Sequence, residues 1–153
     1  TAPDETRHSP LHVQARKSVM PAHLRIARPV RDLERSAAQY ERGLGWQRLG
    51  GFVDHEGFDG VMLGLPGAGH HLELTRCRHH PVEPSPGPED LLVFYVPDPA
   101  AHAARCEALL EAGFVEVEAF NPYWNRNGRC FRDRDGYVLV IARAEWRNVA
   151  PPA

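Results

Sequence analysis

The sequence predicts an α+β fold built from two similar halves, each with the element order β-α-β-β-β. Short stretches such as residues 71–76 alternate polar and apolar side chains, which is the period of a strand with one buried face. Two longer stretches carry apolar residues at helical spacing, and each follows an aspartate and ends at a glycine. The same order of elements occurs twice, which indicates a duplicated module.

The first half begins with a strand predicted over residues 23–28, where Leu24 and Ile26 alternate with other residues. Asp32 is a good N-cap for the helix that follows, and Gly43 and Gly45 are expected to provide its end. The apolar positions of this helix are Leu33, Ala37, Tyr40 and Leu44. Three further strands are expected over residues 46–53, 60–65 and 71–76.

The second half follows a proline-rich linker at residues 78–90. Residues 91–96 predict a mostly apolar strand. Asp98 then caps a helix that has Pro99 at its first position and ends at Gly113. Three more strands are expected over residues 115–117, 129–132 and 137–142.

The predicted division of the chain follows this repeat. The parts are a loosely ordered N-terminal arm (1–21), a single domain (22–143) and a C-terminal tail (144–153). Within the domain we expect a first module over residues 22–77, the linker at 78–90 and a second module over residues 91–143. A module of about 60 residues buries too little surface to be stable alone. The two modules should therefore pack into one domain, or be exchanged between two chains.

Composition excludes several classes of protein. Among 153 residues, 42% are hydrophobic, which is enough for a core, and the net charge of -2 supplies no basic excess for nucleic-acid binding. Three cysteines without a CxxC pair argue against a disulfide framework or a structural zinc site, and favour the reducing cytoplasm. No apolar run approaches the roughly 20 residues that span a membrane. Asp133 and Asp135 lie among arginines, which predicts a mixed, solvated hairpin.

The stretch at residues 71–76 is the first candidate for a functional site. Leu72 and Leu74 point to one face of the predicted strand, while His71 and Glu73 point to the other. A histidine and a glutamate on one face are able to meet a metal, a proton or a ligand. The alternative is an ordinary solvated strand face.

Several short motifs resemble the vicinal oxygen chelate superfamily, which contains glyoxalase I, extradiol dioxygenases and bleomycin resistance proteins. The resemblance covers about residues 22–143. Its carriers are His23-Leu24-Arg25-Ile26, Asp32-Leu33-Glu34-Arg35-Ser36 with Tyr40 and Gly43-Leu44-Gly45, Leu72-Glu73-Leu74, and Phe131-Arg132-Asp133-Arg134-Asp135-Gly136. It implies that two βαβββ modules form a curled mixed sheet around a cup-shaped cavity.

The resemblance also indicates which positions of this sequence would hold a metal ion. Metal-dependent members hold a divalent ion with one residue from each of four strands. In this sequence Glu73 falls on one of these positions, and His23 or Arg25 on another, whereas the remaining two hold Leu91 and Val140. Because hydrocarbon side chains cannot bind an ion, the comparison favours a cup without a metal or other cofactor. The alternative is a Zn, Fe, Mn or Ni ion held by His23, His71 and Glu73.

Further residues are candidates for the wall of such a cup. Tyr95 stands between two apolar neighbours, so its hydroxyl either enters the cup or is satisfied by a backbone carbonyl. Asn121, Tyr123 and Trp124 lie in a loop anchored by a proline, where aromatic rings either stack on a ligand or pin the loop to the core.

Together these features predict a homodimeric protein that binds a small organic molecule without a catalytic metal. Arg25, His71 and Glu73 would supply polar contacts, and aromatic residues the walls. The alternative is a metal-dependent lyase, isomerase or dioxygenase that uses the His/His/Glu set, and a third option is a scaffold with a filled cup. Whether the protein is an enzyme stays open, as does its substrate.

Overall fold

The computed structural model describes residues 22–153, so the arm predicted for residues 1–21 lies outside the described part. The elements in chain order are β1 (Leu24–Pro29), α1 (Leu33–Leu44), β2 (Gln47–His55), β3 (Phe58–Gly64), β4 (His70–Cys77), β5 (Leu91–Tyr95), α2 (Pro99–Glu111), β6 (Val115–Val117), α3 (Pro122–Asn127), β7 (Gly128–Arg132) and β8 (Val138–Ala142). No helix among the described residues is long and apolar enough to cross a membrane.

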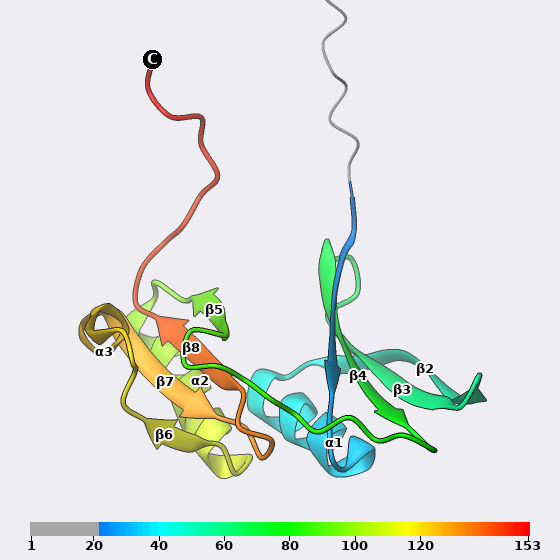
Figure 1. The fold of residues 1–153 in the computed structure, drawn as a ribbon. Coiled ribbons are helices and arrows are strands. Elements are labelled where there is room, and N and C mark those ends of the chain that lie inside the picture. The colour runs from blue at the N-terminus through cyan, green and yellow to red at the C-terminus, as the bar shows by residue number, and fades with distance from the viewer. Residues whose placement is uncertain (1–21) are drawn as a thin grey trace, which may run out of the picture.

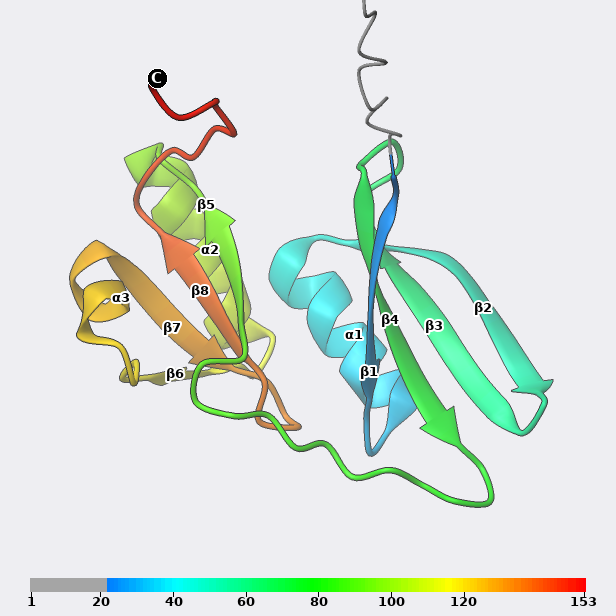
Figure 2. The ribbon, with the colours of Figure 1, turned by 45° about the horizontal axis from the view of Figure 1, so that its top comes forward.

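The strands form two four-stranded mixed sheets, one from each module (Figures 1 and 2). The strand orders are β1-β4-β3-β2 and β5-β8-β7-β6, and in each sheet only the first pair is parallel. This confirms the α+β fold with two βαβββ modules. The two sheets do not join, so β1 and β5 are both edge strands and the curled arrangement is open.

The caps of both long helices are those that the sequence predicts. The side chain of Asp32 accepts a hydrogen bond from the backbone N–H of Arg35 at 3.0 Å, and Asp98 accepts one from Ala101 at 2.8 Å. Gly45 ends α1 with a φ of 68°, in the left-handed region that glycine adopts without steric cost. Local sequence therefore determines where these helices begin and where α1 ends.

Helix α3 is the element that sequence reasoning missed, since residues 121–125 were expected to form a loop. Asn121 caps it by accepting a hydrogen bond from the backbone N–H of Tyr123 at 3.1 Å, and Pro122 stands at its first position. The helix has only six residues and packs against β7 and β8. An isolated helix of this length is unstable in water, so its packing decides its existence.

The hydrophobic core lies where the two modules meet. Helices α1 and α2 pack side by side at the junction of the two sheets (Figures 1 and 2). The largest fully buried apolar side chains of the core are Tyr40, Phe131, Leu63, Leu72, Leu74, Leu109, Leu139 and Ile141. Residues from both modules share this core, so the described chain folds as one packed unit.

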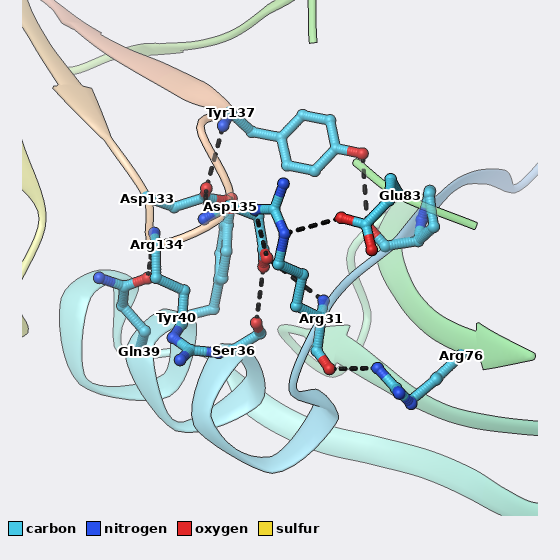
Figure 3. Close-up of polar contacts among 11 residues, drawn as sticks. Arg31, Ser36, Gln39, Tyr40, Arg76, Glu83, Asp133, Arg134, Asp135 and Tyr137 are labelled. Atoms are coloured by element: carbon cyan, nitrogen blue, oxygen red, sulfur yellow. Dashed lines mark hydrogen bonds and ion pairs between the residues drawn. The ribbon is translucent and has the colours of Figure 1, made fainter. Parts of the chain in front are cut away.

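Polar contacts reinforce the same junction (Figure 3). Asp133 and Asp135 in the β7–β8 turn are only 6% and 5% exposed. Tyr40 donates a hydrogen bond to Asp133 at 2.7 Å, and the Ser36 hydroxyl donates one to Asp135 at 2.8 Å. The prediction of a solvated hairpin was therefore wrong for these two carboxylates, because α1 of the other module covers them.

Candidate functional site

The polar candidates of module one lie together on the face of the first sheet opposite to its core. Leu72 and Leu74 are fully buried in the core, so the alternation of β4 turns His71 and Glu73 to the other face. In the parallel pairing of β1 with β4, Arg25 lies opposite His71. The two strands thus bring Arg25, His71 and Glu73 to one surface.

These side chains form a connected chain of contacts that continues to His23. The guanidinium of Arg25 places Nη1 at 3.0 Å from Oε2 of Glu73 and donates from Nε to Nε2 of His71 at 2.8 Å. Nδ1 of His71 lies 2.6 Å from Nε2 of His23. The Glu73 side chain is 11% exposed and that of Arg25 is 48% exposed, so the ion pair has a buried end and an open end.

The environment of His71 disfavours its charged form. Partial burial lowers the pKa of His71 below its usual value, and the adjacent Arg25 guanidinium lowers that pKa further. The imidazole is therefore neutral at pH 7 and is available as a hydrogen-bond acceptor towards Arg25.

Next to this cluster lies a cleft of about 290 Å³ between the two modules. Edge strands β1 and β5 flank it, and most of its lining side chains are apolar. Its lining residues are Leu24, Ile26, Trp46, His70, His71, Leu72, Leu92, Val93, Phe94 and Tyr95. The Trp46 and Phe94 rings meet edge to face with centroids 5.8 Å apart, so an aromatic pair spans the two modules here.

The structure places Tyr95 with His71 in the lining of this cleft. Tyr95 is 40% exposed, and its ring centroid lies 6.1 Å from that of Trp146 in the C-terminal segment. The sequence grouped Tyr95 with Arg25 and Glu73, and the cleft joins the tyrosine to their neighbour His71.

The other three candidates lie elsewhere. Asn121, Tyr123 and Trp124 belong to the start of α3, and none of them lines the cleft. The Asn121 side chain is engaged as the helix cap, and the Tyr123 and Trp124 rings contact each other with centroids 4.9 Å apart. Within one chain, these residues are therefore separate from the Arg25 cluster.

The side chains at the four metal positions do not fit a metal centre. Leu139 and Ile141 lie in the core, so β8 turns Val140 to the opposite face, and the pairing of β5 with β8 gives Leu91 the same orientation as Val138. Leu91 lines a pocket of about 260 Å³ on that side, and Val140 is fully buried. Neither side chain has a lone pair for an ion. Among residues 22–153 no group of three or more His, Cys, Asp or Glu side chains is placed to hold one.

A larger groove, of about 780 Å³, lies on β2 and β3. It is shallow, its floor includes Gly50, Gly51 and Gly60, and none of the predicted site residues lines it. We therefore take the smaller cleft beside His71 as the candidate site, since it combines an apolar interior with polar groups at its edge.

Sequence reasoning missed the apolar side of this site. Trp46 and Phe94 were not among its candidates, although Trp46 directly follows the glycine that ends α1. A large aromatic residue at that point indicates a side chain that packs between the helix and the sheet, because the chain turns there from α1 towards β2. No sequence signal indicated that Phe94 of the second module would meet it.

Two family profiles match the chain. The YycE-like N-terminal domain matches residues 24–75, and the YycE-like C-terminal domain matches residues 89–143. YycE of Bacillus subtilis (strain 168) is 43% identical over 128 residues, which cover 84% of this chain and 92% of that protein. Its crystal structure superimposes with a TM-score of 0.78 at 42% identity, over 86% of this chain and 96% of that one.

More distant structures share the fold. Glyoxalase I from Zea mays matches with a TM-score of 0.60 at 24% identity, over 77% of this chain and 44% of the maize protein. A glyoxalase/bleomycin resistance protein from Streptomyces sp. CB03234 matches with a TM-score of 0.53 at 23% identity, over 79% and 99% of the two chains. The chain belongs to the YycE-like family, and it shares its fold with glyoxalase I and the glyoxalase/bleomycin resistance proteins.

Proposed function

We propose that this protein binds a small organic molecule in the cleft between β1 and β5, without a catalytic metal. The observation that carries the proposal is the cleft of about 290 Å³, whose lining is largely apolar and includes His71, which Arg25 joins to Glu73. Pockets for small molecules combine an apolar interior with a few fixed polar groups in this way. The volume suits a molecule with one or two rings.

The chemistry of the available donors supports binding without a metal. Glu73 is paired with Arg25, and His71 accepts a hydrogen bond from the same guanidinium. An ion held by His23, His71 and Glu73 would have to displace Arg25 from both of its partners. A ligand group is able to bind beside Arg25 with these contacts intact, so we favour the organic ligand over the metal-dependent lyase, isomerase or dioxygenase.

Relatives with this fold provide a precedent for binding. One of these structures is an antibiotic binding protein from Streptomyces sp. CB03234. It matches this chain with a TM-score of 0.56 at 23% identity. YycE itself is assigned only provisionally, to glyoxalases or fosfomycin resistance proteins. We propose binding, with or without subsequent chemistry, as the activity of this chain.

A cytoplasmic homodimer is the assembly that we propose. The three cysteines are all unpaired, which suits a reducing compartment. Strand β6 is an edge of the second sheet away from the cleft, and Val115 in β6 and Phe120 shortly after it are large apolar residues that stay exposed. A second copy would cover such edges and side chains. Light scattering coupled to size exclusion tests this assembly.

The binding proposal is tested with a charge at the mouth of the cleft. Leu24 lines the cleft and is 57% exposed, so Leu24→Asp adds a carboxylate there without burying it in the core. We expect this variant to lose most of the thermal stabilisation that a screened ligand gives to the native protein. Val53→Asp, at a 79% exposed position of β2, is the matched control and should keep it. A ligand that stabilises both variants equally would contradict the proposed location.

A further inference from the structure

The hydrogen bond from Arg25 fixes the proton on His71. A guanidinium only donates, so Nε2 of His71, at 2.8 Å from Nε of Arg25, must be an acceptor. A neutral imidazole carries one proton, which therefore resides on Nδ1 of His71. The lowered pKa of His71 keeps the ring in this neutral form.

The proton on His71 in turn fixes the proton on His23. Nδ1–H of His71 faces Nε2 of His23 at 2.6 Å, so this second nitrogen must accept. Because Nε2 of His23 accepts, the N–H of that ring lies at Nδ1. Both acceptor nitrogens of the pair are occupied within the chain, and the ring nitrogen left for an outside partner is a donor.

Arg25 adds a second outward donor. Its Nε contacts His71 and its Nη1 contacts Glu73, whereas Nη2 makes no hydrogen bond within residues 22–153. The Arg25 side chain is 48% exposed, while the Glu73 carboxylate behind it is 11% exposed. The accessible side of this ion pair therefore presents N–H groups, and its negative charge is held on the inner side.

We infer that this cluster is a carboxylate-binding site, and that the ligand of the cleft is an organic acid with an apolar body. The inference rests on the proposed function, because it names the class of molecule that the same cleft takes. The carboxylate is bound by Arg25 Nη2 and His23 Nδ1, which adjoin the cleft through their contacts with His71, and the apolar body enters the cleft beside the Trp46–Phe94 pair. The site suits a monoanion, because Arg25 shares its N–H donors between Glu73 and one ligand carboxylate, whereas a second carboxylate on the ligand would meet no further cation in this cluster.

Three probes of one shape test the charge preference: 3-phenylpropionate, 3-phenylpropanamide and 3-phenylpropylamine. Their dissociation constants are measured by calorimetry on the full chain at pH 7, and contacts are mapped by amide chemical shifts. We expect the acid to bind at least about tenfold more tightly than the amide or the amine, as a charge-assisted contact predicts. Arg25→Gln should abolish this preference, and Arg35→Gln, a highly exposed arginine on α1, should retain it.

The outcomes separate the two proposals. Equal binding of the acid and the amide, or tighter binding of the amine, would overturn the carboxylate site and leave the apolar cleft in place. A preference for the acid that survives Arg25→Gln would also overturn it. Failure of all three probes to bind, with no shifts around Trp46 and Phe94, would count against the cleft itself and hence against the proposed function.

Discussion

The hydroxyl of Tyr40 in α1 donates a 2.7 Å hydrogen bond to Oδ2 of Asp133 in the β7–β8 turn, and so links the two modules through a buried contact. The other oxygen of Asp133 accepts hydrogen bonds from the backbone N–H groups of Asp135 and Tyr137, at 2.8 and 3.0 Å. Figure 3 shows the backbone nitrogen of Tyr137 pointing at the Asp133 carboxylate, with Tyr40 close by. The sequence carries both residues, but the pairing exists only because α1 packs over the β7–β8 turn.

Removal of the Tyr40 hydroxyl should therefore destabilise the fold. Tyr40→Phe keeps the ring in the core and leaves Oδ2 of Asp133 buried without its donor, which costs about 1–3 kcal/mol of unfolding free energy. Urea denaturation measures the change. Tyr95→Phe removes a hydroxyl from a 40% exposed ring and serves as the control with little effect. Equal stability of the two variants would show that the contact contributes nothing.

The ionisation of Asp133 should be visible in the pH dependence of stability. Burial raises the pKa of Asp133 above its usual 3.8, although hydrogen bonds from Tyr40 and the backbone oppose the shift. The folded state therefore binds a proton more tightly than the unfolded state, and this contribution to stability is lost as the pH rises from 3.8 through the folded pKa. Asparagine does not bind a proton in this pH range, so the Asp133→Asn variant lacks this pH-dependent contribution to stability.

We expect the native protein to gain stability relative to Asp133→Asn as the pH falls through that window. Denaturation curves of both proteins between neutral and acidic pH give the difference directly. Carboxylates that do not interact with Asp133 contribute equally to both proteins and cancel. A difference that stays constant, or that shrinks towards acid, would show that the folded pKa of Asp133 is not raised.

The contact of the two long helices depends on Gly43. An added Cβ at this position would lie 2.8 Å from Cε2 of Phe114 and 2.9 Å from Cδ2 of Leu109. Alanine normally stabilises a helix by about 1 kcal/mol over glycine, but overpacking costs about 1–3 kcal/mol. We expect Gly43→Ala to lower the melting temperature. Gly69→Ala, where no atom lies within 4 Å, is the control. Stabilisation by Gly43→Ala would mean that α1 and α2 are further apart.

Arg25 should control both the charge and the tautomer of His71. Arg25→Gln removes a positive charge and frees Glu73, and both changes favour the protonated ring, so the pKa of His71 rises. Nitrogen-15 spectra should show the Nδ1–H form of His71 in the native protein and a return to the commoner Nε2–H form in the variant. Arg35→Gln should leave both properties unchanged. A native His71 with its proton on Nε2 would refute the hydrogen bond from Arg25.

Purification without chelators tests the absence of a catalytic metal. We expect elemental analysis to find far less than one zinc, iron, manganese or nickel ion per chain, because Leu91 and Val140 hold the positions where two ligands are needed. Addition of these ions should not raise the melting temperature. A stoichiometric ion that disappears in Glu73→Gln would instead support the metal-dependent alternative.

The sequence alone was sufficient for the repeated βαβββ order, the two aspartate caps and the orientation of the strands. Each of these depends on neighbours within a few residues: a side-chain oxygen that reaches the next turn, or the alternation of a strand. The opposite directions of His71 and Leu72 are of this kind, whereas the contact of Arg25 with His71 and Glu73 also needs the parallel pairing of β1 with β4. The residue types at positions 91 and 140 were likewise enough to question a metal centre.

Tertiary structure decided the features that involve both modules. Asp133 and Asp135 look solvated in sequence and are buried because α1 covers them. Trp46 and Phe94 are 48 positions apart in the chain, and only the packing of the modules brings them to one cleft. Nothing local encodes such contacts, since their free energy comes from surfaces that meet only where the two modules pack together.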